Sequence, residues 1–159
     1  MKYHIVAFGV FLIDQLTKYL IAKKMVLGSR VVVIPGFADF VFVRNKGGVF
    51  GLFQSGGDII TVLSVATLFV VSFFYAYSIR NVGGYLSVGL ALVMAGAFGN
   101  VLDRIRFDYV IDFIQLHIGN LFTWHTFNVA DASIVIGAVM LVIYSFSYGK
   151  EREREKVDG

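Results

Sequence analysis

The sequence predicts an all-α integral membrane protein with four transmembrane helices and a small extramembrane β platform between the first two helices. Hydrophobic residues make up 57% of the 159 positions and charged residues only 16%, whereas soluble domains average about 45–50% apolar and about 25% charged residues. The apolar residues are gathered into four long runs, and several aspartates sit inside or at the ends of these runs. The length suits one domain, so we interpret residues 1–159 as a single membrane domain.

Each of the four apolar runs is long enough to cross a hydrocarbon core of about 30 Å at a rise of about 1.5 Å per residue. The first run carries Asp14 and Lys18 in its interior and lacks an obvious small-residue cleavage site. We therefore interpret it as a retained helix rather than a cleaved signal peptide. The predicted spans are residues 3–22, 59–79, 85–102 and 127–148.

The segments outside these runs differ in character. Residues 23–58 contain β-branched and aromatic residues in partial alternation around Pro35-Gly36, which predicts short strands and a turn outside the membrane. Residues 103–126 are expected to form a loop with a short apolar or interfacial piece. Residues 149–159 are expected to form a solvated tail with charges of alternating sign.

Several classes of chemistry are disfavoured by composition. The chain has no cysteine, which excludes disulfides, thiolate metal sites and cysteine nucleophiles. The histidines lack the spacing of HExxH-type metal motifs, and only Ser133 could join His117 or His125 in a Ser-His-Asp set. We therefore expect no metal. A formal charge of +3 without a basic stripe of interleaved aromatic residues predicts no nucleic-acid partner.

Charged side chains inside apolar runs need a partner, because an ionised group in hydrocarbon costs about 2.5–3.5 kcal/mol even on lenient scales. Asp14 and Lys18 lie four residues apart, so they share one face of the first helix, with the acid in the favourable N-terminal position. They can neutralise each other as a structural pair, or they can line a substrate cleft, and the two interpretations are compatible.

Amides and a second acid–base pair lie next to the runs. Asn45 follows a predicted strand within a glycine-rich stretch, where a turn is one explanation of it. Asn100 and Asp103 lie three residues apart at the end of the third run, and Arg104 is placed to pair with Asp103 or with a lipid phosphate. The amide of Asn100 must be satisfied inside the membrane, which favours a role in the interior of the bundle.

Two further aspartates are candidates for acid–base chemistry. Asp112 is the only charge in the stretch VIDFI, and Asp131 lies about one turn into the fourth helix among small residues. Asp131 could instead cap that helix or compensate its dipole, although Asn128 already supplies a better cap. Two carboxylates in a low-dielectric cleft cannot both ionise easily, so one keeps a proton while the other acts as a base toward water. Such a pair can hydrolyse a peptide bond without a third residue type.

A rival pair is Asp103 with Asp131, because each of these acids closes an Asn-x-x-Asp spacing. We favour Asp112 as the partner of Asp131, since the neighbouring Arg104 suits Asp103 to the role of a structural anion. Cleavage assays on asparagine variants of the two aspartates separate these possibilities.

Five short motifs follow one another along the chain: DQLTK at 14–18, RNKGGVF at 44–50, GNVLDR at 99–104, VIDF at 110–113 and FNVAD at 127–131. In this order they resemble the lipoprotein signal peptidase family, the type II signal peptidases, which are intramembrane aspartic peptidases. The likeness covers essentially the whole chain, and the family often has alanines where this chain has Gly48 and Val49.

The resemblance implies a catalytic dyad of Asp112 and Asp131 and no cofactor. It implies that the substrate is a prolipoprotein whose lipobox cysteine carries diacylglycerol and which is cut on the N-terminal side of that cysteine. It also implies sensitivity to globomycin-type cyclic peptides. The residues implied to support the reaction or bind substrate are Asp14, Lys18, Asn45, Gly47, Asn100, Asp103, Arg104, Asn128 and Ala130.

Four crossings place both termini on one side of the membrane and the two long connections on the other. Lysine and arginine are nearly equal in number on the two sides, so the positive-inside rule does not decide the orientation. The clustered charges of the tail and the family resemblance together place both termini in the cytoplasm. The site then faces outward from the bacterial cytoplasmic (inner) membrane, in contact with membrane lipid.

A small proton-coupled transporter component is the alternative function, because intramembrane carboxylates also serve proton relays. Such a protein needs acids spread through the bilayer depth, whereas only Asp14 is clearly deep in this sequence. A non-catalytic membrane scaffold is a third possibility, and it would not need paired acids.

Overall fold

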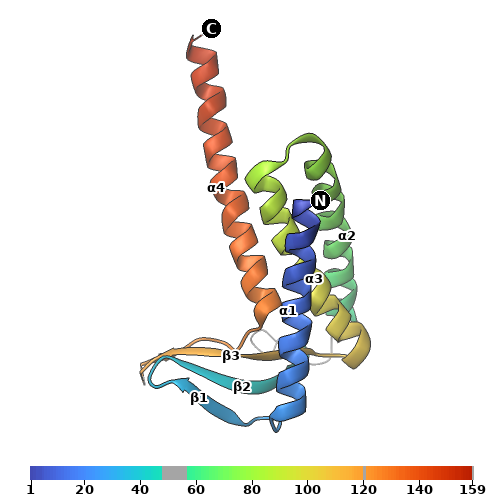
Figure 1. Cartoon of the computed structure of the whole chain (residues 1–159), viewed down its shortest axis with the longest axis vertical. Coiled ribbons are helices and arrows are strands. Elements are labelled where there is room, and N and C mark those ends of the chain that lie inside the picture. Colours follow the sequence, from blue (N-terminus) through green and yellow to red (C-terminus); the bar gives the residue numbers. More distant parts are fainter. Residues whose placement is uncertain (48–56, 120, 159) are drawn as a thin grey trace.

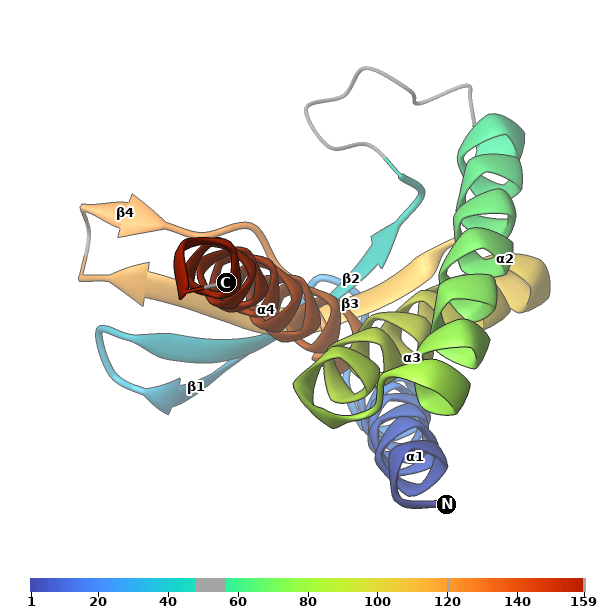
Figure 2. The ribbon, with the colours of Figure 1, turned by 90° about the horizontal axis from the view of Figure 1, so that it is seen from above.

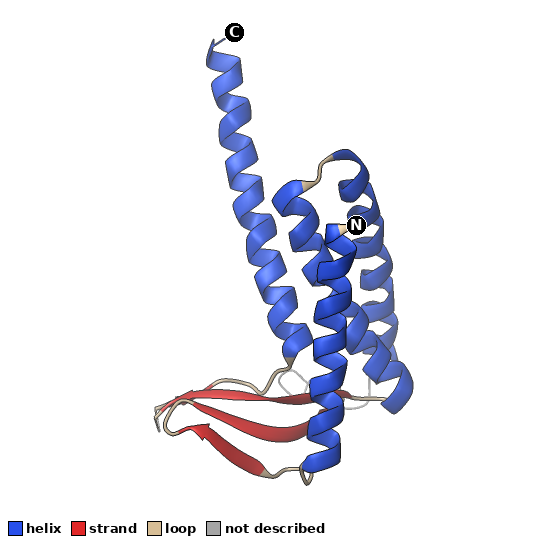
Figure 3. Cartoon of the chain, viewed as in Figure 1, coloured by secondary structure: helices blue, strands red, loops and turns tan. Residues whose placement is uncertain are grey.

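The computed structural model describes residues 1–47, 57–119 and 121–158. In these ranges, four long helices stand on one side of a small antiparallel sheet (Figure 1 and Figure 3). Both chain termini lie at the end of the helices away from the sheet. The predicted architecture of four membrane helices with a β platform is confirmed.

Each of the four helices is apolar over a length that can cross a membrane. They are α1 (Lys2–Lys24), α2 (Gly57–Asn81), α3 (Gly84–Phe107) and α4 (Val129–Asp158). Within the apolar windows, 50% of α3 is buried against 6% of α2, so α3 is the central helix. Large side chains such as Phe69 and Phe73 on α2 face outward, which suits contact with lipid.

Small residues let α4 approach α3 closely. A Cβ added at Gly96 of α3 would collide with the carbonyl oxygen of Ala130 and the hydroxyl of Ser133 on α4. Further along the helices, a Cβ on Gly137 would lie 2.6 Å from the carbonyl oxygen of Gly89. Glycine therefore allows the two helices to pack backbone to backbone, and the first turn of α4 is held against α3.

The platform is a four-stranded antiparallel sheet with its strands in sequence order. The strands are β1 (Arg30–Ile34), β2 (Ala38–Asn45), β3 (Val110–Ile118) and β4 (Phe122–Thr123). A cluster of Ile21, Phe42, Ile111 and Phe113 packs the end of α1 against β2 and β3. The sheet is thus fixed to the helices where β3 begins, and its far end extends past α4 (Figure 2).

Strands β1 and β2 confirm the short strands expected around Pro35-Gly36, whereas the expectation of a loop over residues 103–126 is wrong. Strands β3 and β4 occupy much of that segment. The first four residues of β3 are all buried, so the alternation that marks a strand with one solvated face is missing there. Residues 48–56 of the predicted platform lie outside the described residues.

All four helices are longer than the predicted spans, and α3 and α4 exceed them most. Helix α3 continues past residue 102 to Phe107, and Asp108 ends it in the left-handed conformation at φ 63°, which aspartate tolerates better than most residues. Helix α4 continues past residue 148 to Asp158 through lysine, arginine and glutamate, which are good helix formers. A helix satisfies its backbone hydrogen bonds in lipid and in water alike, so hydropathy alone underestimates helix length.

Gly96→Ala is expected to lower thermal stability, because its Cβ would overlap backbone and hydroxyl atoms of α4, and overpacking costs about 1–3 kcal/mol. Gly9→Ala is the matched control, since a Cβ there meets nothing within 4 Å and alanine is the better helix former. Circular dichroism of both variants in detergent gives the unfolding midpoints. Equal midpoints would contradict the close contact of α3 with α4.

Candidate active site

Polar side chains from five elements and their connections meet where the helices join the sheet. Hydrogen bonds and ion pairs link them into one continuous network. Its members are Asp14, Lys18, Asn45, Asn100, Asp103, Asp112, Asn128 and Asp131. The structure thus brings together, at one end of the bundle, residues that are far apart in the sequence.

Asp112 on β3 is only 2% exposed and accepts hydrogen bonds on both carboxylate oxygens. Asn45 Nδ2 donates to Oδ2 at 2.8 Å, and Asn128 Nδ2 donates to Oδ1 at 2.8 Å. Burial raises the pKa of Asp112 to about 6, the amide donors and Lys18 act against this rise, and the charge of Asp131 adds to it. The Asp112 carboxyl is therefore half-protonated near pH 6.

Asp131 lies in the first turn of α4 and forms a capping box with Asn128. Asp131 Oδ2 accepts the backbone N–H of Asn128 at 3.1 Å, and Asn128 Oδ1 accepts the backbone N–H of Asp131 at 2.9 Å. Asn100 Nδ2 donates to the other carboxylate oxygen at 2.7 Å. The capping role considered for Asp131 is thus observed, and it keeps this carboxylate at a fixed place in the network.

Asn128 is fully buried and touches both candidate catalytic acids. Its side-chain amide donates to Asp112 at 2.8 Å and to Asn100 Oδ1 at 3.1 Å, and its backbone N–H donates to Asp131. A single residue therefore holds two carboxylates that come from β3 and α4.

The orientation of Asn45 depends on a glycine in the left-handed region. Gly47 has φ +93°, and its N–H donates to Asn45 Oδ1 at 2.8 Å, so the amide nitrogen of Asn45 is left facing Asp112. A Cβ on Gly47 would also collide with the side chain of Ile60. Residues 48–50, which complete this motif, lie outside the described residues.

Lys18 is the centre of a buried ion triad. Its Nζ lies 2.9 Å from Asp14 Oδ2 and 3.0 Å from Asp103 Oδ2, and these charged side chains are at most 2% exposed. The predicted pairing of Asp14 with Lys18 is confirmed. The predicted pairing of Arg104 with Asp103 is wrong, because the Arg104 guanidinium donates to the carbonyl oxygen of Asn100 at 3.3 Å. Pairing with a lipid phosphate stays a prediction. Adjacent helical residues point in different directions, so the cation on Asp103 is Lys18 instead.

Asp103 is fully engaged within this triad. Its Oδ1 accepts from Gln15 at 3.2 Å, and its Oδ2 accepts the backbone N–H of Ile111 at 3.2 Å besides contacting Lys18. Its contacts are with Gln15, Ile111 and Lys18, whereas Asp112 shares the donor residue Asn128 with Asp131. The geometry therefore favours Asp112 over Asp103 as the partner of Asp131.

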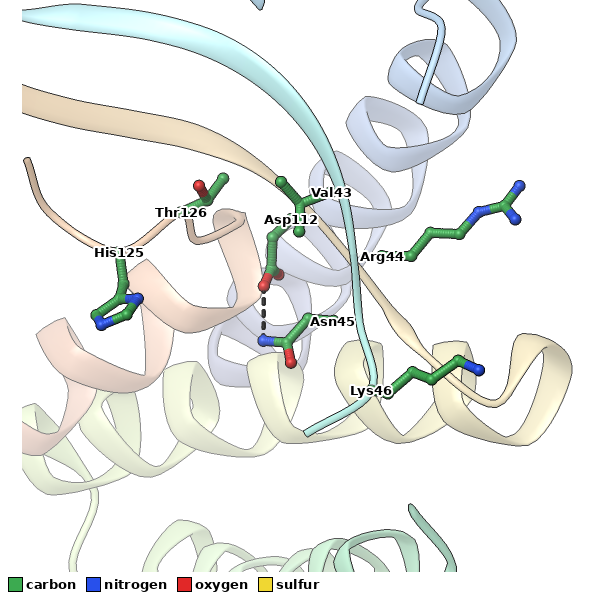
Figure 4. Close-up of a pocket in the computed structure, with 7 residues that line it drawn as sticks. All are labelled: Val43, Arg44, Asn45, Lys46, Asp112, His125 and Thr126. Atoms are coloured by element: carbon green, nitrogen blue, oxygen red, sulfur yellow. Dashed lines mark hydrogen bonds between the residues drawn. The ribbon is translucent and has the colours of Figure 1, made fainter. Parts of the chain in front are cut away.

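Two clefts, each about 540 Å³, open beside the paired acids. In Figure 4, Asp112 and Asn45 point toward each other in the first cleft, His125 lies across from them, and Lys46 extends away. Asp131 lies in the second cleft, whose other lining residues are Leu116, Trp124, Phe127, Ala132, Val135 and Ile136. Asp112 thus lines a largely polar cleft, and Asp131 lines a separate apolar one.

Some site residues escaped sequence reasoning. Gln15 donates to Asp14 at 3.1 Å and to Asp103 at 3.2 Å, and its place within the DQLTK motif was the available signal. The sequence predicts a role for His125 only in the metal and serine alternatives and none for Thr126, yet both residues line the Asp112 cleft. Nothing in the sequence of this connection indicated which wall of the site it would form.

Two residues of the possible Ser-His-Asp set contact other groups. His117 lies on β3 with its Nε2 2.9 Å from Asp39, and Ser133 donates to the carbonyl oxygen of Ala130 at 2.8 Å. Within residues 1–47, 57–119 and 121–158, no three His, Asp or Glu side chains form a group suited to a metal ion.

Comparison with known proteins places this chain in a family. A model of Peptidase_A8, described as signal peptidase (SPase) II, matches residues 6–147. The chain belongs to the signal peptidase II family. The resemblance predicted from the five motifs is therefore confirmed.

Relatives of the signal peptidase II family match over nearly the whole chain. The lipoprotein signal peptidase of Clostridium novyi (strain NT) is 34% identical over 150 residues, which cover 94% of this chain and 100% of that protein. The lipoprotein signal peptidase of Syntrophus aciditrophicus (strain SB) is 39% identical over 148 residues, with 90% and 91% covered. A bacterial membrane enzyme solved by the in meso method at 2.3 Å resolution has a TM-score of 0.80 and 31% identity, over 92% of this chain and 88% of that one.

Asn45→Leu in this signal peptidase II family member is expected to raise the pKa of Asp112 above about 6, because a hydrogen bond that lowers the pKa is lost. Infrared difference spectroscopy of the protonated carboxyl during a pH titration measures the midpoint. Asn81→Leu is the control, since Asn81 is exposed and donates to the carbonyl oxygen of Tyr77. A midpoint that stays constant or falls in Asn45→Leu would contradict the role assigned to Asn45.

Proposed function

We propose that this protein is an aspartic endopeptidase of the bacterial inner membrane that removes signal peptides from prolipoproteins. The observation that carries the proposal is the pair Asp112 and Asp131, both held by Asn128 where the helices meet the sheet. Membership of the signal peptidase II family and relatives named lipoprotein signal peptidase support this activity. Four apolar helices support a multi-pass membrane location.

The two acids have complementary roles in the proposed reaction. Asp112, whose pKa is raised to about 6 by burial, carries the shared proton, and Asp131 accepts a proton from water as the water oxygen attacks the scissile carbonyl carbon. Asp112 gives its proton to the carbonyl oxygen, and a tetrahedral diol results. When the carbon–nitrogen bond breaks, the proton on Asp131 moves to the departing amine, and Asp112 regains a proton from the diol.

The two clefts support a lipidated substrate. The cleft beside Asp131 is lined by apolar side chains such as Trp124 and Val135, which suit a diacylglyceryl group, whereas the polar cleft beside Asp112 suits a peptide backbone. The scissile bond then lies N-terminal to a diacylglyceryl-modified cysteine. Globomycin-type cyclic peptides are proposed to compete for the same clefts, and no nucleic-acid partner is proposed.

The proposed orientation has both termini in the cytoplasm and the sheet at the outer membrane surface. Both chain ends lie away from the sheet (Figure 1), and the charged residues 149–159 suit a cytoplasmic tail. The sheet exposes about half of the surface of Val31, Val33 and Phe37, which suits a platform that touches lipid at the membrane boundary.

The site geometry favours the peptidase over the transporter alternative. A proton relay needs carboxylates at several depths of the bilayer. Asp14, Asp103 and Asp131 come from three different helices, yet they belong to one connected network at one end of the bundle.

Asp112→Asn and Asp131→Asn are each expected to slow cleavage by roughly 10²–10⁴-fold, because each removes one partner in proton transfer. Release of the signal peptide from a purified diacylglyceryl-modified prolipoprotein measures the rate. Asp103→Asn is expected to keep slow cleavage. Asp39→Asn is expected to cleave at the wild-type rate, since Asp39 pairs with Arg30 and His117 on the sheet.

Complete loss of cleavage in Asp103→Asn together with activity in Asp112→Asn would transfer the dyad assignment to Asp103. Loss of activity in Asp39→Asn would show that the loss reflects general destabilisation rather than the dyad.

Cleavage is expected to fall as the pH is raised through about 6. Asp112 is an acid with a raised pKa, so it holds its proton below about 6 and loses it above. Once ionised, it cannot protonate the carbonyl oxygen, and the rate then decreases by up to about tenfold per pH unit. Single-turnover rates measured across this range, with the folded fraction checked by circular dichroism, give the profile. A rate that climbs with pH over the same range would rule out Asp112 as the proton donor.

A further inference from the structure

Asp14 holds the first turn of α4. Its Oδ1 accepts the backbone N–H of Ala130, the residue before Asp131, at 2.9 Å. N–H groups in the first turn of a helix lack an acceptor within the helix, so this bond satisfies such a donor and ties α4 to α1. Gly99 leaves room for the contact, because an added Cβ would lie 2.5 Å from Asp14 Oδ2. The helix that carries Asp131 is thereby fixed to α1.

Asp103 holds the start of β3 in the same manner. Its Oδ2 accepts the backbone N–H of Ile111, the residue before Asp112, at 3.2 Å. Asp103 itself is 1% exposed, so water does not compete for this bond. The strand that carries Asp112 is thereby fixed to α3.

Lys18 connects the two holding carboxylates. Its Nζ lies 2.9 Å from Asp14 Oδ2 and 3.0 Å from Asp103 Oδ2. A third hydrogen bond runs from the same nitrogen to Asn100 Oδ1 at 2.9 Å. An ammonium group has three donors and no acceptor, so all three are in use. The backbone supports of the two dyad acids are therefore joined through one buried cation.

Lys18 also decides which way the Asn100 amide points. Because Lys18 can only donate, the amide oxygen faces it, and Nδ2 is left to donate to Asp131 at 2.7 Å. The Asn128 amide donates to the same Asn100 oxygen at 3.1 Å, which agrees with this orientation. A flipped Asn100 would aim its oxygen at the Asp131 carboxylate, where two acceptors would repel.

We propose that Lys18 is a positioning residue that sets the separation and the orientation of Asp112 and Asp131. It acts through the two carboxylates with which it pairs and through the Asn100 amide, without touching the substrate. The inference rests on the proposed peptidase function, because it presupposes that the two acids share a proton.

The titration of Asp112 provides a readout that a purely structural role would not change. The charged groups that act on Asp112 are Lys18 from α1, Arg104 from α3 and Asp131 from α4, and His125 lines its cleft. The positive charge of Lys18 lowers the pKa of Asp112, so removal of this charge is expected to move the pH profile to higher pH.

Lys18→Met removes the charge and all three donors but keeps an unbranched side chain. The expected result is a kcat reduced by roughly 10²-fold, as for a small misplacement of reacting groups, with little change in KM. The falling limb of the pH profile and the infrared midpoint of Asp112 are both expected to move to higher pH. If Lys18 were needed only for stability, the substitution would lower the Tm without shifting the falling limb of the pH profile or the infrared midpoint of Asp112.

Two control variants distinguish an effect on the placement of Asp112 and Asp131 from an effect on the stability of the protein. Lys18→Arg keeps the charge and is expected to return the limb of the pH profile to its wild-type position. Asp39→Asn removes an acid that is 1% exposed, ion-paired to Arg30 and 2.9 Å from His117 Nε2 on the sheet. This control is expected to lower the Tm while kcat and the limb stay as in the wild type.

The outcomes distinguish this proposal from the proposed function. If the wild-type protein does not cleave lipidated prolipoprotein, the proposed peptidase function is overturned. If the wild type cleaves, and folded Lys18→Met has the same kcat and the same falling limb of the pH profile, only the positioning role is overturned. If Lys18→Met does not fold, Lys18→Gln is measured in the same way. If both Lys18 variants fail to fold while Asp39→Asn folds, the positioning role is also overturned. Lys18 would then be needed for folding rather than for placing Asp112 and Asp131.

Discussion

The ammonium group of Lys18 lies buried between carboxylates from two helices, and the rest of the site depends on this contact. Removing one partner of a buried ion pair leaves an uncompensated charge and costs about 3–5 kcal/mol. Helices α1 and α3 therefore cannot separate at this end without exposing charge to an apolar environment. The same two carboxylates bind backbone N–H groups of α4 and β3, so the constraint on the helices extends to the sheet.

Apolar packing and polar contacts have different roles where the sheet meets the helices. The cluster of Ile21, Phe42, Ile111 and Phe113 brings the sheet against α1, but burial of apolar surface is non-directional and does not choose one angle of approach. Hydrogen bonds require particular distances and angles. The polar network therefore selects one arrangement from those that the apolar contacts allow, and it does so where the candidate catalytic acids lie.

Local signals in the sequence predicted the parts of the fold that are specified locally. Four apolar runs predicted the helices, alternation around Pro35-Gly36 predicted β1 and β2, and the i,i+4 spacing predicted the pair of Asp14 with Lys18. Strand β3 was missed because its buried start has no alternation. The partners that define the site could not be derived from spacing, since Lys18 meets Asp103 and Asn128 meets Asp112 only after elements distant in the chain have packed.

Asp131 is part of the capping box of α4 as well as a candidate catalytic acid, so its protonation would affect how firmly the first turn of α4 is held. In the proposed reaction its carboxylate takes up a proton, and a neutral acid is a weaker acceptor for the Asn128 N–H and a weaker complement to the helix dipole. Each catalytic cycle would then loosen and retighten the first turn of α4. The start of this helix would be held less firmly while Asp131 carries the proton, and as firmly as before once the product amine has taken that proton.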